Sequence, residues 1–325
     1  MRNAKIMLAM VVATMFALSA CKKNQTIIEK EVRVVQYVDP INDWKAFSPK
    51  SQLFTIIDAG KSQTITTAHG AKFMFHAGAL KDLMNVNIIG NVTLQITEYL
   101  TLADMLFSGV TVTAGNELLE SGGMFSITAT QGNKTVVVND SSGLQILFPK
   151  TNKGDEMMQF WNGEKNKKDS FNRINWVKND SVKVIRAKDT NQQLSPNYGI
   201  NFNYFQFGYS NIDREAFSGM PKVNRFRIKL PNGCVDSNST ALLMFKDYNA
   251  CAWCFWVTND KEMSTYYNLP VGKKVKVLIY KKTGKNDNDI SYSVKEITLE
   301  SNTTVTFDAI TPTTKLGLAG IIKGL

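Results

Sequence analysis

The chain has 325 residues, of which 43% are hydrophobic and 20% charged, and 38 Lys and Arg against 28 Asp and Glu give a net charge of +10. These proportions are ordinary for a globular protein and exclude a mostly disordered chain, a collagen-like chain and a multi-pass membrane protein. The length is enough for about two domains. The only histidines are His69 and His76, which argues against a histidine-rich metal site and a histidine-based proton relay. We expect no metal and no cofactor.

The first 21 residues carry the strongest signal. Arg2 and Lys5 precede an apolar run over residues 6–18. The tetrapeptide Leu-Ser-Ala-Cys then ends at Cys21. This run is shorter than the roughly 20 residues that a membrane-spanning helix needs, and it has the length of a signal-peptide core. The tetrapeptide resembles the lipobox of bacterial lipoproteins, which implies removal of residues 1–20 and acylation of Cys21 with fatty acids such as palmitate.

The residues after Cys21 favour the outer membrane. In many Gram-negative bacteria an Asp directly after the lipidated cysteine marks retention in the inner membrane, and Lys22 occupies that position here. In some bacteria an acidic stretch sends lipoproteins to the cell surface, whereas residues 22–26 include two lysines and no acid. We therefore expect a lipid anchor in the outer membrane, with the periplasmic face slightly favoured over the cell surface.

The mature chain reads as a succession of short β-strands separated by turns that contain Gly and Asn. Residues 91–99 and 223–230 alternate apolar and polar side chains, as half-buried strands do, while residues 101–107 have the cap and apolar face of a short helix. We predict an all-β fold with two β-sandwich-like modules. The expected divisions are a lipid-anchored tether at 21–50, a first β-sandwich at 51–150, a connector with hairpins at 151–199, and a second β domain at 200–325.

Several short motifs in this order resemble a known domain. The first three are residues 75–80 (Phe-His-Ala-Gly-Ala-Leu), 91–94 (Asn-Val-Thr-Leu) and 119–124 (Leu-Glu-Ser-Gly-Gly-Met). They are similar to the β-sandwich domain shared by zonula-occludens proteins, netrin receptors and ankyrins. With residues 174–177, 208–213, 243–247 and 270–272, the chain more closely resembles a family of uncharacterised Gram-negative bacterial lipoproteins. The resemblance implies this fold and the lipid anchor, and it implies no activity.

Three cysteines remain once Cys21 is lipidated. Cys251 and Cys254 have the spacing of a CxxC motif, and Cys234 stands alone. Because disulfides form in an oxidising cell envelope, the sequence favours a structural disulfide, either Cys251–Cys254 or Cys234 with one of the two. The rival interpretation is a redox protein, which requires a reactive thiolate at Cys251.

The remaining features favour binding over catalysis. Residues 253–256 bring Trp253 and Trp256 close in sequence, and exposed on one face they would stack on sugar rings. No nucleophile elbow, zinc-protease motif or phosphate-binding loop occurs, although carboxylates paired in space would escape such a search. We therefore expect a non-catalytic, lipid-anchored cell-envelope binding or scaffolding protein. Its expected partner is another envelope protein or a glycan, not a nucleic acid, and the alternative is a carbohydrate-binding lipoprotein.

Overall fold

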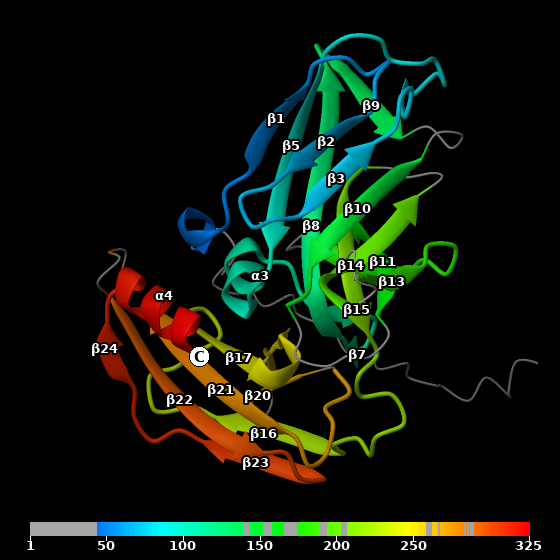
Figure 1. Ribbon diagram of the computed structural model, residues 1–325. Helices are drawn as coiled ribbons and strands as arrows, with labels where there is room; N and C mark the ends of the chain where they lie inside the picture. Colours follow the sequence, from blue (N-terminus) through cyan, green and yellow to red (C-terminus); the bar gives the residue numbers. More distant parts are fainter. Residues whose placement is uncertain are drawn as a thin grey trace, which may run out of the picture. The chain divides into compact units, whose positions relative to one another are not determined.

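The computed structural model describes residues 44–138, 143–151, 158–165, 174–188, 194–202, 207–257, 262–265, 267–282, 284, 286 and 289–325. This part of the chain is mostly β, with several antiparallel sheets and two α-helices, which confirms the predicted fold class (Figure 1). None of its helices has both the length and the apolar character needed to cross a membrane. The predicted signal peptide, Cys21 and the tether up to residue 43 lie outside the described residues.

The first module is a sandwich of two sheets. One sheet has the strand order β1-β5-β8-β15-β11-β12, with β9 paired to β8 and to β4, and the other has the order β13-β14-β10-β3-β2. The strands of the first sheet are β1 (Gln52–Ile56), β4 (Leu80–Asp82), β5 (Val92–Tyr99), β8 (Glu120–Gln131), β9 (Lys134–Val138), β11 (Gln159–Lys165), β12 (Ile174–Lys178) and β15 (Tyr209–Arg214). Those of the second are β2 (Gln63–Thr66), β3 (Lys72–Phe75), β10 (Leu144–Pro149), β13 (Val184–Lys188) and β14 (Leu194–Phe202).

The second module is also built from two sheets. Their orders are β19-β20-β16-β23 and β18-β17-β21-β22-β24. The pair β16–β23 is parallel, whereas the other pairs within these two sheets are antiparallel. The strands are β16 (Arg225–Lys229), β17 (Ser239–Phe245), β18 (Ala250–Trp253), β19 (Phe255–Val257), β20 (Glu262–Ser264), β21 (Lys274–Lys282), β22 (Ile290–Thr298), β23 (Asn302–Thr306) and β24 (Thr311–Thr313).

Each sandwich encloses its own core. In the first module the rings of Phe73 and Phe125 meet edge to face from opposite sheets, with centroids 5.5 Å apart. In the second module Phe226 and Ile228 of β16 pack in one cluster with Leu243 and Phe245 of β17. Apolar side chains at alternate positions of each strand explain these cores, because successive residues of a strand point to opposite faces.

A third apolar cluster joins the two modules. It contains Met124 and Trp161 from the first module and Leu242, Leu278 and Tyr280 from the second. Since alternate residues of β17 enter this cluster and the core of the second module, the sheet that contains β17 is buried on both faces. The unbroken burial of Ser239–Phe245 follows from this position.

Helices and short elements contribute to the third cluster. α3 (Leu102–Ser108) starts at Thr101, which forms a capping box with Asp104, as the sequence predicts. α4 (Lys315–Gly324) buries Leu318, Ala319 and Ile322, so the C-terminal residues pack on the core. The remaining short elements are the 3₁₀ turns η1 (Lys45–Phe47) and η2 (Lys246–Tyr248) and the paired strands β6 (Thr113–Ala114) and β7 (Glu117–Leu118).

The strand pairing places the end of the first module later than the sequence divisions do. The hairpin β11–β12 and the strands β13 and β14, which lie mostly in the predicted connector, extend both sheets of the first module. β15 falls within the range predicted for the second module, yet it pairs with β8 and β11. Sequence spacing cannot assign a strand to a sheet, because pairing between distant strands is decided by packing.

Candidate functional site

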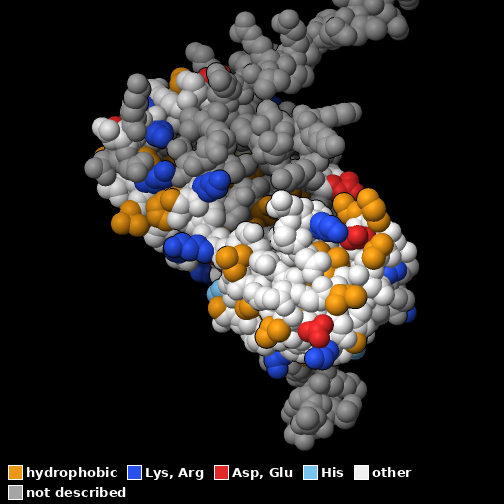
Figure 2. All heavy atoms as spheres, turned by 90° about the horizontal axis from the view of Figure 1, so that it is seen from above, with side chains coloured by type: hydrophobic (Ala, Val, Ile, Leu, Met, Phe, Trp, Pro, Cys, Tyr) orange, Lys and Arg blue, Asp and Glu red, His pale blue; other side chains and the backbone are white. Residues whose placement is uncertain are grey.

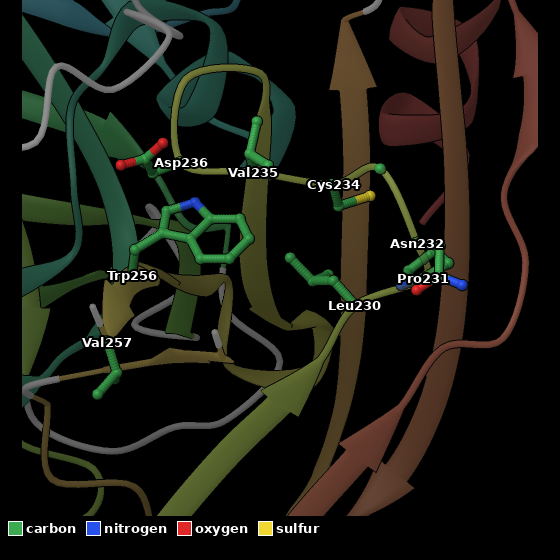
Figure 3. A pocket seen from close by; sticks show the side chains of 9 residues that line it. Leu230, Pro231, Asn232, Cys234, Val235, Asp236, Trp256 and Val257 are labelled. Carbon is green, nitrogen blue, oxygen red and sulfur yellow. The ribbon is translucent and has the colours of Figure 1, made fainter. Parts of the chain in front are cut away.

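A pocket of about 420 Å³ lies at one end of the second module, between the end of β16, the loop that leads to β17, and strand β19 (Figure 3). Two of the residues singled out from the sequence, Trp256 and Cys234, line it. The others are Leu230, Pro231, Asn232, Gly233, Val235, Asp236 and Val257. Among the predicted residues, these two are therefore brought together at one site.

The loop from residue 231 to residue 238 is held by its own hydrogen bonds. The amide of Cys234 donates to the carbonyl of Pro231 over 3.2 Å, and Gly233 between them has φ +81°, the conformation that a type II turn requires at this position. The side chain of Asn238 accepts from the amide of Val235 and donates to the carbonyl of Gly233. These contacts fix the wall of the pocket that carries Cys234 and Asp236.

The indole of Trp256 forms the opposite wall. Its Nε1 donates to the carbonyl of Ser239 over 3.3 Å, and the side chain is half-buried against the core of the second module. Figure 3 shows the ring lying between Leu230 and the loop side chains Val235 and Asp236. Because the hydrogen bond and the core contact orient the ring, it offers a preformed aromatic surface.

The chemistry of this pocket combines an aromatic surface with a few polar groups. The Asp236 carboxylate accepts hydrogen bonds, and the exposed amide of Asn232 both donates and accepts them. Leu230 and Val235 add aliphatic surface. A small molecule with one apolar face and hydroxyl groups at its edge matches this set, and a sugar ring is such a molecule.

Trp253 does not share the site. It is only 8% exposed and packs in the cluster between the modules, whereas Trp256 packs against the core of the second module. The two residues are three positions apart, and an odd separation along extended backbone sends side chains to opposite faces. The patch of two exposed tryptophans that the alternative interpretation requires is therefore not formed, and of the two only Trp256 lines the pocket.

The three described cysteines are free in this structure. The thiol of Cys251 is buried in the cluster between the modules, and burial raises its pKa to about 12. The thiol of Cys254 is buried in the core of the second module, and burial likewise raises its pKa. The odd separation again places the two side chains on opposite faces, so this CxxC spacing brings no two sulfurs together.

Buried carboxyl groups occur in the first module, away from the pocket. Glu98 is buried and accepts hydrogen bonds from Thr67, His69 and Gln52, at 2.8 to 2.9 Å. Glu120 is buried beneath Arg214, whose Nη2 lies 2.7 Å from its carboxylate. The fully buried Asp213 accepts a hydrogen bond from Asn211, and burial raises its pKa well above the ordinary value. Each of these groups is held by donors within the fold.

Glycines in the motifs at residues 75–80 and 119–124 have structural roles. Gly78 and Gly123 have φ of +69° and +117°, which L side chains rarely adopt. A Cβ atom at Gly122 would lie 2.8 Å from the carbonyl oxygen of Ile212 on the neighbouring strand. Gly122 therefore lets β8 and β15 approach closely, and Gly123 lies against the ring of Phe148, so packing accounts for both glycines without a ligand.

Searches against known protein families and against curated proteins found no match for this chain. Within the described residues, no three side chains of His, Cys, Asp or Glu are grouped so that they could hold a metal ion. Sequence reasoning missed Asn232 and Asp236 as pocket residues. The available signal was the Pro-Asn-Gly turn directly before Cys234, which marks a loop between two strands.

Proposed function

We propose that this protein is a non-catalytic, lipid-anchored binding protein of the cell envelope, and that the pocket at Trp256 takes a sugar ring of an envelope glycan. The observation that carries the proposal is the oriented indole in a pocket that the side chains of Asp236 and Asn232 also line. An indole attracts the C–H face of a sugar, and the polar side chains match hydroxyl groups at its edge. The volume of about 420 Å³ suits one or two sugar residues.

The proposed lipid anchor at Cys21 would keep the pocket close to the glycans of the envelope. An acylated protein is confined to the membrane surface, so a weak pocket is presented to its ligand at a high effective concentration. We place the anchor in the outer membrane, with the domains on the periplasmic face. Lys22 and Lys23 directly after Cys21 support this placement.

The binding step is tested on a panel of envelope glycans with the full chain in detergent. Trp256→Ala removes the aromatic wall and should abolish binding, and Asp236→Asn should weaken it while keeping the size of the side chain. Leu316→Ala is the matched control, because Leu316 is 72% exposed and lies on α4, outside the pocket. Equal binding by wild type and Trp256→Ala would refute the pocket as the site.

The anchor is tested separately by the mass of the N-terminal peptide of the protein extracted from membranes. Acylation predicts a peptide that begins at Cys21 and carries fatty acids, and Cys21→Ala should leave the leader uncleaved. An unmodified peptide that begins elsewhere would refute the anchor and leave the pocket untouched.

A scaffold that holds another envelope protein is the second candidate. It is favoured by the third apolar cluster, which connects the two modules through Met124, Trp161, Leu242 and Leu278. Modules joined by a shared core present their surfaces in a fixed relation, as a scaffold requires. Capture of one specific envelope protein that survives Trp256→Ala would favour this candidate over the glycan.

A further inference from the structure

Large apolar side chains stand exposed on two neighbouring loops of the first module. Leu83, Met84, Val86 and Ile89 lie between β4 and β5, and Ile57 lies between β1 and β2; we call these five residues the apolar tip. They are between 58% and 87% exposed, with Met84 the most exposed. The amide of Ala59 donates to the carbonyl of Gly90 over 3.0 Å, which joins the two loops.

The turn that carries Leu83 and Met84 is held firmly in place. The Asp82 carboxylate accepts from the amides of both Met84 and Val86 at 2.9 Å, and the amide of Asn85 donates to the Asp82 carbonyl at 3.0 Å. Asn85 has φ +67°, and its side chain accepts from Lys81. Since the chain fixes this turn and still directs its large side chains outward, their exposure is a property of the folded state.

Two carboxylates near the apolar tip have partners within the fold. Asp58 pairs with Lys61 at 3.3 Å, and the Asp82 carboxylate is occupied by backbone amides. Figure 2 shows apolar side chains on the surface as separate groups, with charged side chains between them. Insertion would bury the apolar side chains while the charged side chains between them stay at the level of the headgroups.

We propose that the apolar tip inserts into the interfacial region of a lipid bilayer and forms a second contact with the membrane. This inference rests on the proposed anchor at Cys21. Residues 22–43 precede the described part of the chain, and fully extended they would reach about 75 Å. A tether of this length lets the apolar tip reach the bilayer, and the anchor keeps the tip at a high effective concentration near it. Aliphatic side chains gain free energy when they pass from water into the boundary between headgroups and acyl chains, so a bilayer held nearby is the surface that matches the apolar tip.

The proposal is tested with a fluorescent label on the full lipidated chain in vesicles. Met84→Cys and Leu316→Cys each carry an environment-sensitive dye, in a Cys234→Ser background that removes the partly exposed native thiol. Leu316 is the matched control because it is a large apolar residue on α4 that is 72% exposed, against 87% for Met84. The dye at position 84 should shift to the blue and be quenched severalfold more by brominated acyl chains than the dye at position 316.

Each other result overturns the proposal. Equal quenching at the two positions would mean that the apolar tip has no preferred contact with the bilayer. A blue shift without quenching would mean that the tip contacts protein instead of lipid. If the N-terminal peptide proves unacylated, the anchor has failed, and flotation with vesicles then tests the tip directly. In that case wild type should float and the variant Leu83→Gln with Met84→Gln should not; no flotation of wild type would refute the tip. Glycan binding is measured in a separate experiment, so a negative result for the apolar tip leaves the proposal for the pocket as it stands.

Discussion

At the scale of single residues, Gly123 shows how closely the strands of the first module fit. Its φ of +117° disfavours any side chain, and a Cβ atom there would lie 2.6 Å from the ring of the buried Phe148. Gly115 also has a positive φ, +57°, but this value lies in the left-handed region that L residues can enter, and open space surrounds it, so Gly115→Ala measures a small backbone cost without overpacking.

Gly123→Ala is therefore expected to destabilise the protein by about 1–3 kcal/mol more than Gly115→Ala, because it adds overpacking to backbone strain. Denaturant unfolding of both variants measures the difference. Equal destabilisation would show that Phe148 moves aside without loss of stability.

A second residue, Asp213, predicts how stability depends on pH. Burial raises its pKa well above the ordinary value, so the folded protein keeps this carboxyl group neutral while the unfolded chain ionises near pH 4. The folded state then binds more protons than the unfolded state, and stability falls as pH rises from about 4 toward the raised pKa.

Asp213→Asn should remove this decline, since an amide cannot ionise. The free energy of unfolding measured from pH 4 to pH 8 tests it. Asp58→Asn is the control, because the amide of Gly60 and the side chain of Lys61 lower the pKa of Asp58, so its titration changes stability only below about pH 4 and the decline from pH 4 to pH 8 should stay as in wild type. An unchanged decline in Asp213→Asn would assign the pH dependence to other groups.

At the scale of elements, the extended backbone from β18 to β19 places the side chains of Cys251 and Cys254 on opposite faces. Cys251 and Cys254 enter different apolar clusters, and burial raises the pKa of both thiols. Cys234 lies in the pocket wall and is partly exposed.

Under native conditions an alkylating reagent should therefore modify Cys234 and leave Cys251 and Cys254 intact until denaturant is added. Peptide mass spectrometry identifies the modified residues. Modification of Cys251 as fast as that of Cys234 would instead support a reactive thiolate and the redox interpretation. Failure to modify two cysteines in denaturant without reductant would support the disulfide predicted from the sequence.

At the scale of the whole molecule, the third apolar cluster links the stability of the two modules. Leu278 of β21 is fully buried in this cluster, together with Met124 and Trp161 of the first module. Loss of a buried leucine side chain to alanine costs about 2–5 kcal/mol. If the cluster couples the modules, this substitution lowers the free energy of unfolding of both.

Leu278→Ala should therefore lower the denaturation midpoints of peptides from β3 and from β16 together, as followed by hydrogen exchange. Wild type should show coincident midpoints for the same two peptides. A shift confined to the β16 peptide would mean that the modules unfold independently.

Local patterns predicted much of this fold. The capping box at Thr101 and Asp104 specifies a helix within a few residues, and the alternation over 223–230 specifies a strand and its buried face. The pairing of β15 with β8 and the cluster between the modules depend on contacts far apart in the chain, which no local pattern encodes. For the same reason, the sequence predicted only part of the site. Trp256 and Cys234 stood out by residue type, whereas Asp236 acquires its place only when the loop folds beside the indole.

The central claim is that the pocket at Trp256 binds a sugar, and the rate of alkylation of Cys234 tests it most directly because this thiol lines the same pocket. The measurement compares the full chain with and without glycan fragments of the cell envelope, for wild type and for Trp256→Ala. The fragments should slow the alkylation of Cys234 in wild type, and this protection should disappear in Trp256→Ala. An alkylation rate that the fragments leave unchanged in wild type would contradict the account.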